Sequence, residues 1–151
     1  MPIGEDSGPI HPKPTRRSGY RYFFYAKHHG QGGPDAAQWL PTLSHDEEFS
    51  VFNEADFHDL VDERGWLYGV RVDTDGEVLD VGTVGQQVAA FPYARPNEAW
   101  HGYPLWPLRE AGPNNRRGEK NRPSKEVFQK MEERMRLKAC DSKRLWKGNR
   151  A

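Results

Sequence analysis

Residues 66–83, WLYGVRVDTDGEVLDVGT, decide the fold of this chain. Alternate side chains from Trp66 to Val72 are apolar, and this period of two is that of a β-strand. The turn Asp73-Thr74-Asp75-Gly76 follows, and Asp and Gly tolerate the backbone conformations that tight turns need. The chain then enters a second strand-like run, EVLDVGT. The stretch therefore predicts a β-hairpin over about residues 66–83.

A run of aromatic residues upstream predicts a first core strand. The run YRYFFYA, residues 20–26, is short and is bounded by Gly19 and by a glycine-rich loop. Aromatic residues are enriched in strands, and such boundaries are typical of them.

An acidic helix is expected between this strand and the hairpin. Apolar residues recur at helical spacing over about Glu54–Arg64, with Asn53 as the cap and Gly65 after the end. Ser44, followed three residues later by Glu47, fits a capping box, but the apolar pattern after it fits either a helix or a strand.

Two further segments follow the predicted hairpin. The sequence VGQQVAAF, residues 84–91, predicts a short helix. The segment 91–108, FPYARPNEAWHGYPLWPL, then places prolines at 92, 96, 104 and 107, which argue against regular structure. We expect a structured aromatic loop that caps the sheet.

Two helices are predicted near the C-terminal end. Ser124 is expected to cap the first, whose apolar residues Val127, Phe128 and Met131 fall on one face. Asp141 is expected to cap a second, shorter helix that carries Trp146. Both are rich in Lys and Arg, so they predict a basic helical hairpin.

Together these elements predict a small α+β fold with one core. A chain of 151 residues has the length of one domain. We expect a flexible arm over residues 1–18, an α+β core over 19–110, a polar linker over 111–122, and the basic helical hairpin over 123–151, packed on the core or extending from it.

Composition limits the compartment and the chemistry. The only cysteine, Cys140, excludes an internal disulfide and a thiolate metal site, and it favours a reducing compartment. No apolar run has signal-peptide form or the length of a membrane span. We expect a soluble cytoplasmic protein with no membrane association and no cofactor.

The formal net charge of zero hides a separation of charge along the chain. Residues 1–30 carry a net charge of +3, residues 31–100 carry −11, and residues 101–151 carry +8. The acidic middle and the basic end either face each other or face different partners.

The aromatic loop holds the best candidate for catalysis. His101 lies near Glu98, Arg95 and Arg109, and imidazole titrates near neutral pH. A His, a carboxylate and an Arg are sufficient for metal-independent cleavage of a phosphodiester, in which the Arg stabilises the transition-state charge. The competing interpretation is that His101 packs in the loop and bonds a carbonyl.

The remaining sequence motifs give weaker evidence for a function. No HExxH pair, calcium loop, phosphate-binding glycine loop or nucleophile elbow is complete, so we predict no metal site.

Two groups of residues are candidates for binding. The aromatic loop offers Trp100, Tyr103 and Trp106, and both Trp and Tyr are enriched at interaction hot spots. The basic end offers Arg116, Arg117, Lys143, Arg144 and Lys147, which suit an anionic partner such as nucleic acid. Acidic residues among these cations equally favour a solvated, self-neutralised face.

The leading hypothesis is a small binding or regulatory protein of inhibitor or immunity type. It would use the acidic helix and the aromatic loop for a protein partner, and the basic end for an anionic one. The rivals are a metal-independent nuclease that uses His101, and a nucleic-acid-binding protein without chemistry.

Overall fold

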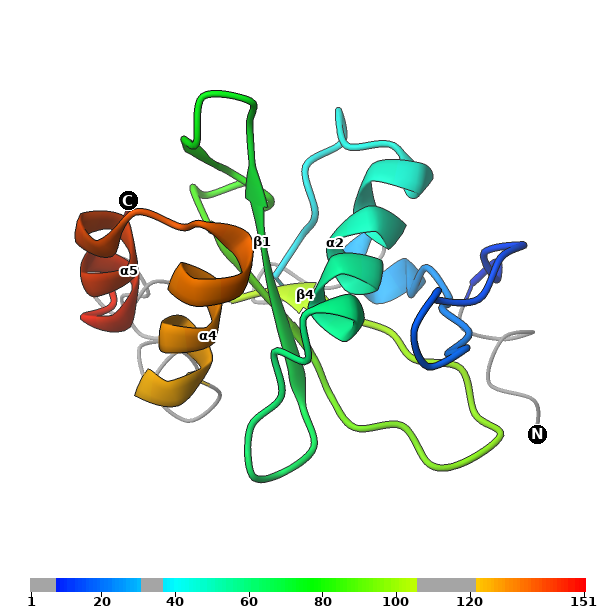
Figure 1. Ribbon diagram of the computed structural model, residues 1–151. Coiled ribbons are helices and arrows are strands. Elements are labelled where there is room, and N and C mark those ends of the chain that lie inside the picture. The colour runs from blue at the N-terminus through cyan, green and yellow to red at the C-terminus, as the bar shows by residue number, and fades with distance from the viewer. Residues whose placement is uncertain (1–7, 31–36, 106–121) are drawn as a thin grey trace.

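A four-stranded antiparallel sheet forms the middle layer of this α+β protein. The computed structural model describes residues 8–30, 37–105 and 122–151 (Figure 1). The strand order is β2-β1-β3-β4, with β1 at Leu67–Val72, β2 at Val78–Leu79, β3 at Val88–Phe91 and β4 at Tyr103–Pro104. The predicted hairpin is confirmed, because β1 and β2 pair antiparallel.

The turn of this hairpin is held by one aspartate. The Oδ1 atom of Asp73 accepts hydrogen bonds from the backbone N–H groups of Asp75 (2.8 Å) and Glu77 (2.9 Å). Asp favours turns because its side chain bonds its own backbone in this way.

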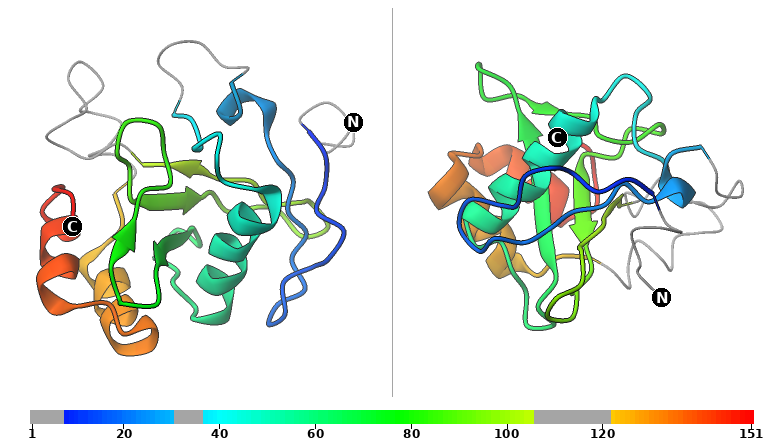
Figure 2. Two further views of the ribbon diagram at one scale, coloured as in Figure 1. Left: turned by 90° about the horizontal axis from the view of Figure 1, so that it is seen from above. Right: turned by 90° about the vertical axis from the view of Figure 1, so that its right-hand side faces the viewer.

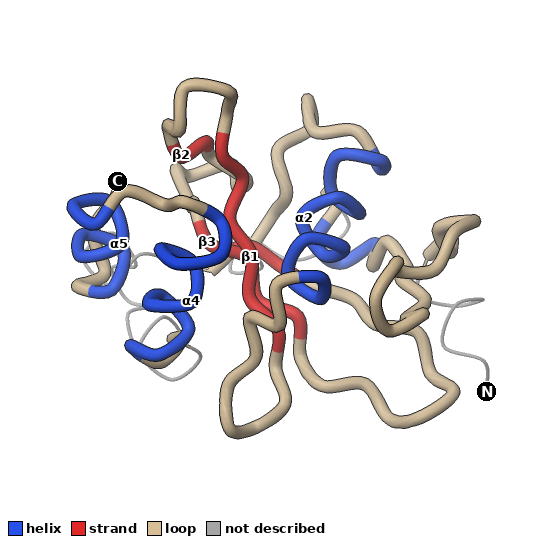
Figure 3. The backbone as a smooth tube through the Cα atoms, viewed as in Figure 1, coloured by secondary structure: helices blue, strands red, loops and turns tan. Residues whose placement is uncertain are grey.

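The sheet buries both faces. Leu67, Ala89 and Phe91 point into one core, and the alternate residues point into a second core on the opposite face. Helix α2 (His45–Phe57) covers the first face, and helices α4 (Lys125–Met135) and α5 (Ala139–Trp146) cover the second (Figure 1). Figure 3 shows the strands crossing between these two helical layers.

Helix α2 begins earlier than the helix predicted over Glu54–Arg64. Ser44 makes a complete capping box with Glu47, so the segment after Ser44 is helical. Asn53 lies inside the helix, and Asp59 is left-handed (φ 52°) beyond its end. The later apolar residues did not mark one helix face, because Phe57 is exposed whereas Leu60 is buried in the second core.

A glycine sets the distance between α2 and the sheet. A Cβ atom on Gly69 of β1 would lie 2.7 Å from Cγ1 of Val51 and 3.0 Å from its carbonyl oxygen. Only glycine therefore allows this close approach of helix and strand.

The helix predicted over residues 84–91 is wrong, because Val88–Phe91 forms β3. All four residues of this strand are buried, and β3 pairs with β1 on one side and β4 on the other. Burial between two strands and two helical layers overrides the helix preference of alanine.

The aromatic run 20–26 is not one of the four strands, and its last residue begins the short 3-10 helix η1 (Ala26–His28). The run makes isolated bridges, Ile10↔Phe23 and Tyr22↔Trp100. Its neighbour, the segment 8–18, contains prolines that lack an N–H donor, and this prevents a continuous ladder.

Residues 8–18, which the sequence assigns to a flexible arm, lie against the core. The N–H of His11 donates to the carbonyl of Tyr22 (2.8 Å), and His11 and Thr15 are buried. Figure 2 shows this segment, in blue, running beside α2. Residues 1–7 of the predicted arm lie outside the described residues.

The C-terminal helices form the predicted hairpin and pack on the sheet. Val127, Phe128 and Met131 are buried in the second core. Ser124 occupies the cap position of α4 without a side-chain hydrogen bond, and α5 begins at a Lys138 cap, with Asp141 in its first turn. Within the described ranges, no helix has the length and apolar character needed to cross a bilayer.

Candidate functional site

The aromatic loop is anchored by a buried tryptophan. Trp100 is 4% exposed and its ring lies 5.7 Å from that of Phe52. Its backbone N–H donates to the carbonyl of Arg21 (2.7 Å), and its carbonyl accepts from the N–H of Phe23 (2.8 Å). Tyr103 is half-buried in β4, with its ring 5.3 Å from that of His28. These two predicted contact residues thus belong mainly to the packing of the fold, and Trp106 lies outside the described residues.

The loop nevertheless builds a pocket on its outer side, which we call the aromatic–arginine pocket. It encloses about 410 Å³. Its chemistry comes from Tyr20, Arg21, Tyr93, Arg95, Glu98 and Trp100.

Two exposed tyrosines flank the buried tryptophan of this pocket. Tyr20 is 36% exposed and Tyr93 is 56% exposed. The Tyr20 ring lies 4.9 Å from the Trp100 ring, and Tyr93 meets Trp100 edge-on at 6.1 Å. The aromatic walls are therefore held by contacts with the core while their outer surfaces face solvent.

A tight turn presents the charged rim. The N–H of Glu98 donates to the carbonyl of Arg95 (3.0 Å), and Asn97 is left-handed (φ 71°). Arg21, Arg95 and Glu98 are exposed, and none of the three makes an ion pair or a side-chain hydrogen bond with another described residue. Two unpaired guanidinium groups beside aromatic rings suit an anionic group on a partner.

The structure does not bring the predicted catalytic residues together. Arg95 and Glu98 line the aromatic–arginine pocket, whereas His101 is not among its lining residues. The His101 ring packs against Phe23 (4.9 Å) and Tyr25 (5.2 Å). Among the described residues no carboxylate pairs with His101, and Arg109 lies outside them.

Burial keeps His101 neutral at pH 7. Loss of solvation, and then the nearby His28 and Lys27, lower the pKa of His101 to about 4. Burial also lowers the pKa of His28 to about 4, against the hydrogen bond between its Nδ1 and the carbonyl of Ala37 (2.7 Å). A neutral imidazole can still accept a proton, but a general acid at neutral pH needs the charged form.

Each carboxylate of α2 has a partner within the molecule. Asp46 lies 3.0 Å from Nε2 of His11, Glu47 pairs with Arg71, and Glu54 lies 3.0 Å from Nε2 of His58. Asp56 accepts hydrogen bonds from the backbone N–H (3.0 Å) and the hydroxyl (2.6 Å) of Ser18. The acidic helix therefore offers a partner less unpaired charge than its sequence indicates.

The fifth carboxylate, Glu48, forms a buried polar group that no sequence motif indicated. Glu48 is 1% exposed and accepts a hydrogen bond from the hydroxyl of Tyr22 (2.6 Å). Nε2 of His29 lies 3.0 Å from the other oxygen, without the geometry of a hydrogen bond. Burial, followed by the Glu48 charge, raises the pKa of Tyr22 well above its usual range.

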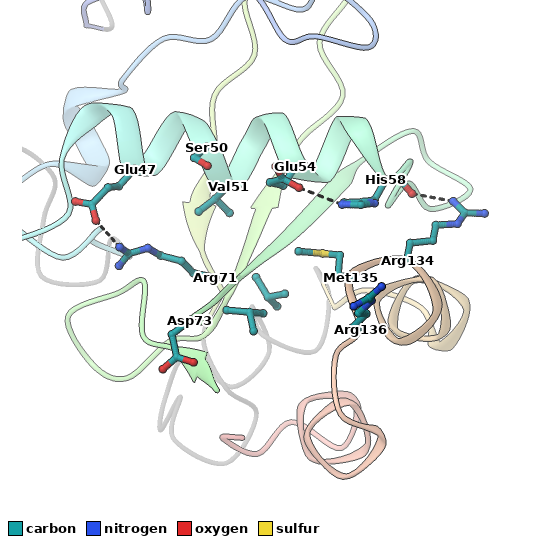
Figure 4. A pocket seen from close by; sticks show the side chains of 12 residues that line it. Glu47, Ser50, Val51, Glu54, His58, Arg71, Asp73, Arg134, Met135 and Arg136 are labelled. Atoms are coloured by element: carbon teal, nitrogen blue, oxygen red, sulfur yellow. Dashed lines mark hydrogen bonds and ion pairs between the residues drawn. The ribbon is translucent and has the colours of Figure 1, made fainter. Parts of the chain in front are cut away.

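The acidic middle and the basic end meet across a groove between α2, β1 and the end of α4. The groove has a volume of about 570 Å³. Figure 4 shows Glu47 of α2 pointing to Arg71 at one end, and Glu54 with His58, the residue after α2, near Arg134 at the other. Nη1 of Arg134 donates to the carbonyl of His58 (2.8 Å).

Other cations of the C-terminal end also bind the acidic middle. Nζ of Lys130 donates to the carbonyl of Asp59 (3.1 Å), and Nζ of Lys138 pairs with Glu77 (2.7 Å). Arg150 pairs with Asp80 (3.1 Å). Two ion pairs and two bonds to backbone carbonyls therefore join the basic end to the acidic middle within one molecule.

The predicted cations of α5 and its C-cap residue Lys147 differ from these, because they remain on the surface. Lys143, Arg144 and Lys147 are exposed. Within the described ranges Lys143 and Lys147 make no ion pair, and Arg144 lies 3.8 Å from Asp141. Arg116 and Arg117 lie outside the described residues.

Comparison with protein-family models, with curated proteins and with solved structures finds no match to this chain. Among the described residues, no cluster of three His, Cys, Asp or Glu side chains has the arrangement of a metal site.

Proposed function

We propose that the protein is a non-catalytic binding protein that docks an acidic segment of a partner protein on the aromatic–arginine pocket. One observation carries the proposal. Exposed Tyr20 and Tyr93 stand beside the unpaired Arg21 and Arg95 over the buried anchor Trp100.

This composition is that of a protein-interaction hot spot. Tyr, Trp and Arg are enriched at such sites, and Tyr and Trp bury large areas at a low cost in side-chain freedom. Arg binds a carboxylate through two parallel hydrogen bonds. The partner segment is therefore expected to carry Asp or Glu, next to a side chain that packs between the tyrosines.

The carboxylates of α2 have no leading part in this function. They are paired with residues of the same chain, so the proposed surface is centred on the aromatic loop. Glu98 lies on the rim and is expected to repel a partner carboxylate placed next to it, which would favour one orientation of the partner.

A displayed library of random peptides tests the proposal. We expect the protein to enrich acidic peptides, and Arg95→Ala and Tyr93→Ala to lose that enrichment. Arg136→Ala is the matched control, because Arg136 is also an exposed arginine but lies in the groove of Figure 4. Circular dichroism checks that each variant is folded.

Two results would oppose the proposal. Selection without acidic peptides, or enrichment that survives both pocket variants, would rule out this pocket as the docking site. Cleavage of labelled RNA or DNA that is lost in His101→Ala would instead support the nuclease alternative.

A further inference from the structure

The C-terminal helices form a second pocket, on a different surface from the aromatic–arginine pocket. It encloses about 290 Å³ between α4 and α5. Lys125, Phe128, Gln129 and Glu132 contribute from α4, and Lys143 and Trp146 contribute from α5. We call it the α4–α5 pocket.

An exposed tryptophan forms one wall. Trp146 is 37% exposed, whereas its neighbour Leu145 is 6% exposed and packs in the second core. Nζ of Lys125 lies 5.2 Å from the centre of the Trp146 ring. The ring is therefore partly open to solvent, with a cation beside it and the buried Phe128 close by in the pocket.

Three lysines belong to this pocket or its edge: Lys125 and Lys143 line it, and Lys147 follows Trp146 in the chain. Lys130, Arg134, Lys138 and Arg150 bind carbonyls or carboxylates of the acidic middle. In contrast, Lys125, Lys143 and Lys147 make no ion pair with any described residue.

We propose that the α4–α5 pocket binds a base of single-stranded nucleic acid. Trp146 stacks on the base, and Lys125, Lys143 and Lys147 contact the flanking phosphates. This combination of an aromatic platform and unpaired cations is the one that single-strand-binding proteins use.

The remaining polar side chains fit a base edge. Gln129 offers amide donors and an acceptor, and Glu132 offers an acceptor for an exocyclic amino group. Glu132 also repels phosphate, so the strand is expected to place its backbone on the Lys143 side of the pocket. A paired base cannot enter in this way, because both its faces are stacked in the duplex.

Fluorescence anisotropy tests the proposal, with labelled single strands of RNA and DNA and with a duplex. Strands of about 15 nucleotides are long enough to span one such site. Trp146→Ala is expected to weaken single-strand binding roughly 5- to 100-fold, whereas Trp146→Phe retains most of it, because a phenyl ring also stacks. Changing Lys143 or Lys147 to Gln is expected to reduce the slope of log affinity against log salt by about 0.7 each.

Arg136→Gln is the matched control, because it removes one exposed positive charge outside the pocket. We expect it to change affinity less than either lysine substitution. Absence of binding to both single strands, binding that Trp146→Ala leaves unchanged, or equal binding of the duplex would overturn the proposal. It does not depend on the aromatic–arginine pocket, so Arg95→Ala is expected to leave nucleic-acid binding intact.

Discussion

At the scale of single residues, two histidines that are kept neutral link the fold to pH. His28 and His101 are packed among aromatic rings, and burial lowers the pKa of each to about 4. In the unfolded chain each would titrate near pH 6.5. The unfolded state therefore binds protons first as the pH falls, so stability is full above pH 6.5 and is lost toward pH 4.

We expect His101→Gln to flatten this dependence. The variant cannot be protonated at this position, so the loss of unfolding free energy between pH 6.5 and 5 should be smaller by about 1.5 kcal/mol than in the unchanged protein. Urea unfolding at each pH measures the difference. NMR titration of the His101 ring should have its midpoint near pH 4, and a midpoint near 6.5 would contradict the burial argument.

The sequence indicates which residue types a surface contains, but not which of them are buried and which are exposed. Its prolines predict a loop over residues 91–108, but Tyr103–Pro104 forms the edge strand β4. Trp100 is an anchor, and the exposed rings are Tyr20 and Tyr93. Tyr20 lies more than seventy positions earlier in the chain than Tyr93, so only the folded backbone brings the two together. The same is true of the contact between Tyr22 and Glu48.

At the scale of elements, features formed by neighbouring residues could be predicted from the sequence. Features that depend on contacts with distant residues could not. The capping box at Ser44 and the turn at Asp73 are formed by neighbouring residues, so the sequence contains all that they require. The sequence of β3 predicts a helix because its alanines have high helix propensity. The segment is a strand because it is buried between β1 and β4, and that burial depends on distant residues. The sequence places Leu60 inside the acidic helix, but α2 ends before it, because Leu60 packs in the core on the opposite face of the sheet.

The two serine caps give a matched pair of variants. Oγ of Ser44 accepts a hydrogen bond from the N–H of Glu47 (3.1 Å), whereas Ser124 makes no side-chain cap bond. Ser44→Ala should lower the free energy of unfolding by about 1 kcal/mol. Ser124→Ala should have a clearly smaller effect in the same urea unfolding measurement. Equal losses would show that the capping box is not what stabilises the start of α2.

At the scale of the whole molecule, one sheet lies between two cores. The acidic middle and the basic end of the chain contact each other beside this sheet. Residues 123–151 contribute Val127, Phe128 and Met131 to the second core. Lys130 and Arg134 of the same region bind carbonyls that follow α2. The sequence showed the separation of charge but left open whether it is satisfied in one molecule, because charge patterns carry no distances.

Phe128→Ala tests whether the C-terminal helices are integral to the domain. Phe128 is 2% exposed, so the substitution should cost about 3–5 kcal/mol of stability. Helical signal by far-UV circular dichroism and tertiary signal by near-UV circular dichroism should be lost together. Val84→Ala, at a side chain that is 45% exposed, should change stability by less than about 0.5 kcal/mol. Melting of the helices ahead of the sheet would show a separable unit.

The covering of the sheet by α4 and α5 has a consequence for biosynthesis. The ribosome makes β1 and β3 well before Lys125–Trp146, so Tyr68 and Val70 lack the cover of Val127, Phe128 and Met131 while the chain is growing. A nascent chain in this state exposes an apolar sheet, which is the kind of surface that aggregates and that chaperones bind. Slow translation after Phe91 would prolong that exposure, so the yield of folded protein is expected to depend on how quickly the stretch from Pro92 to Trp146 is added.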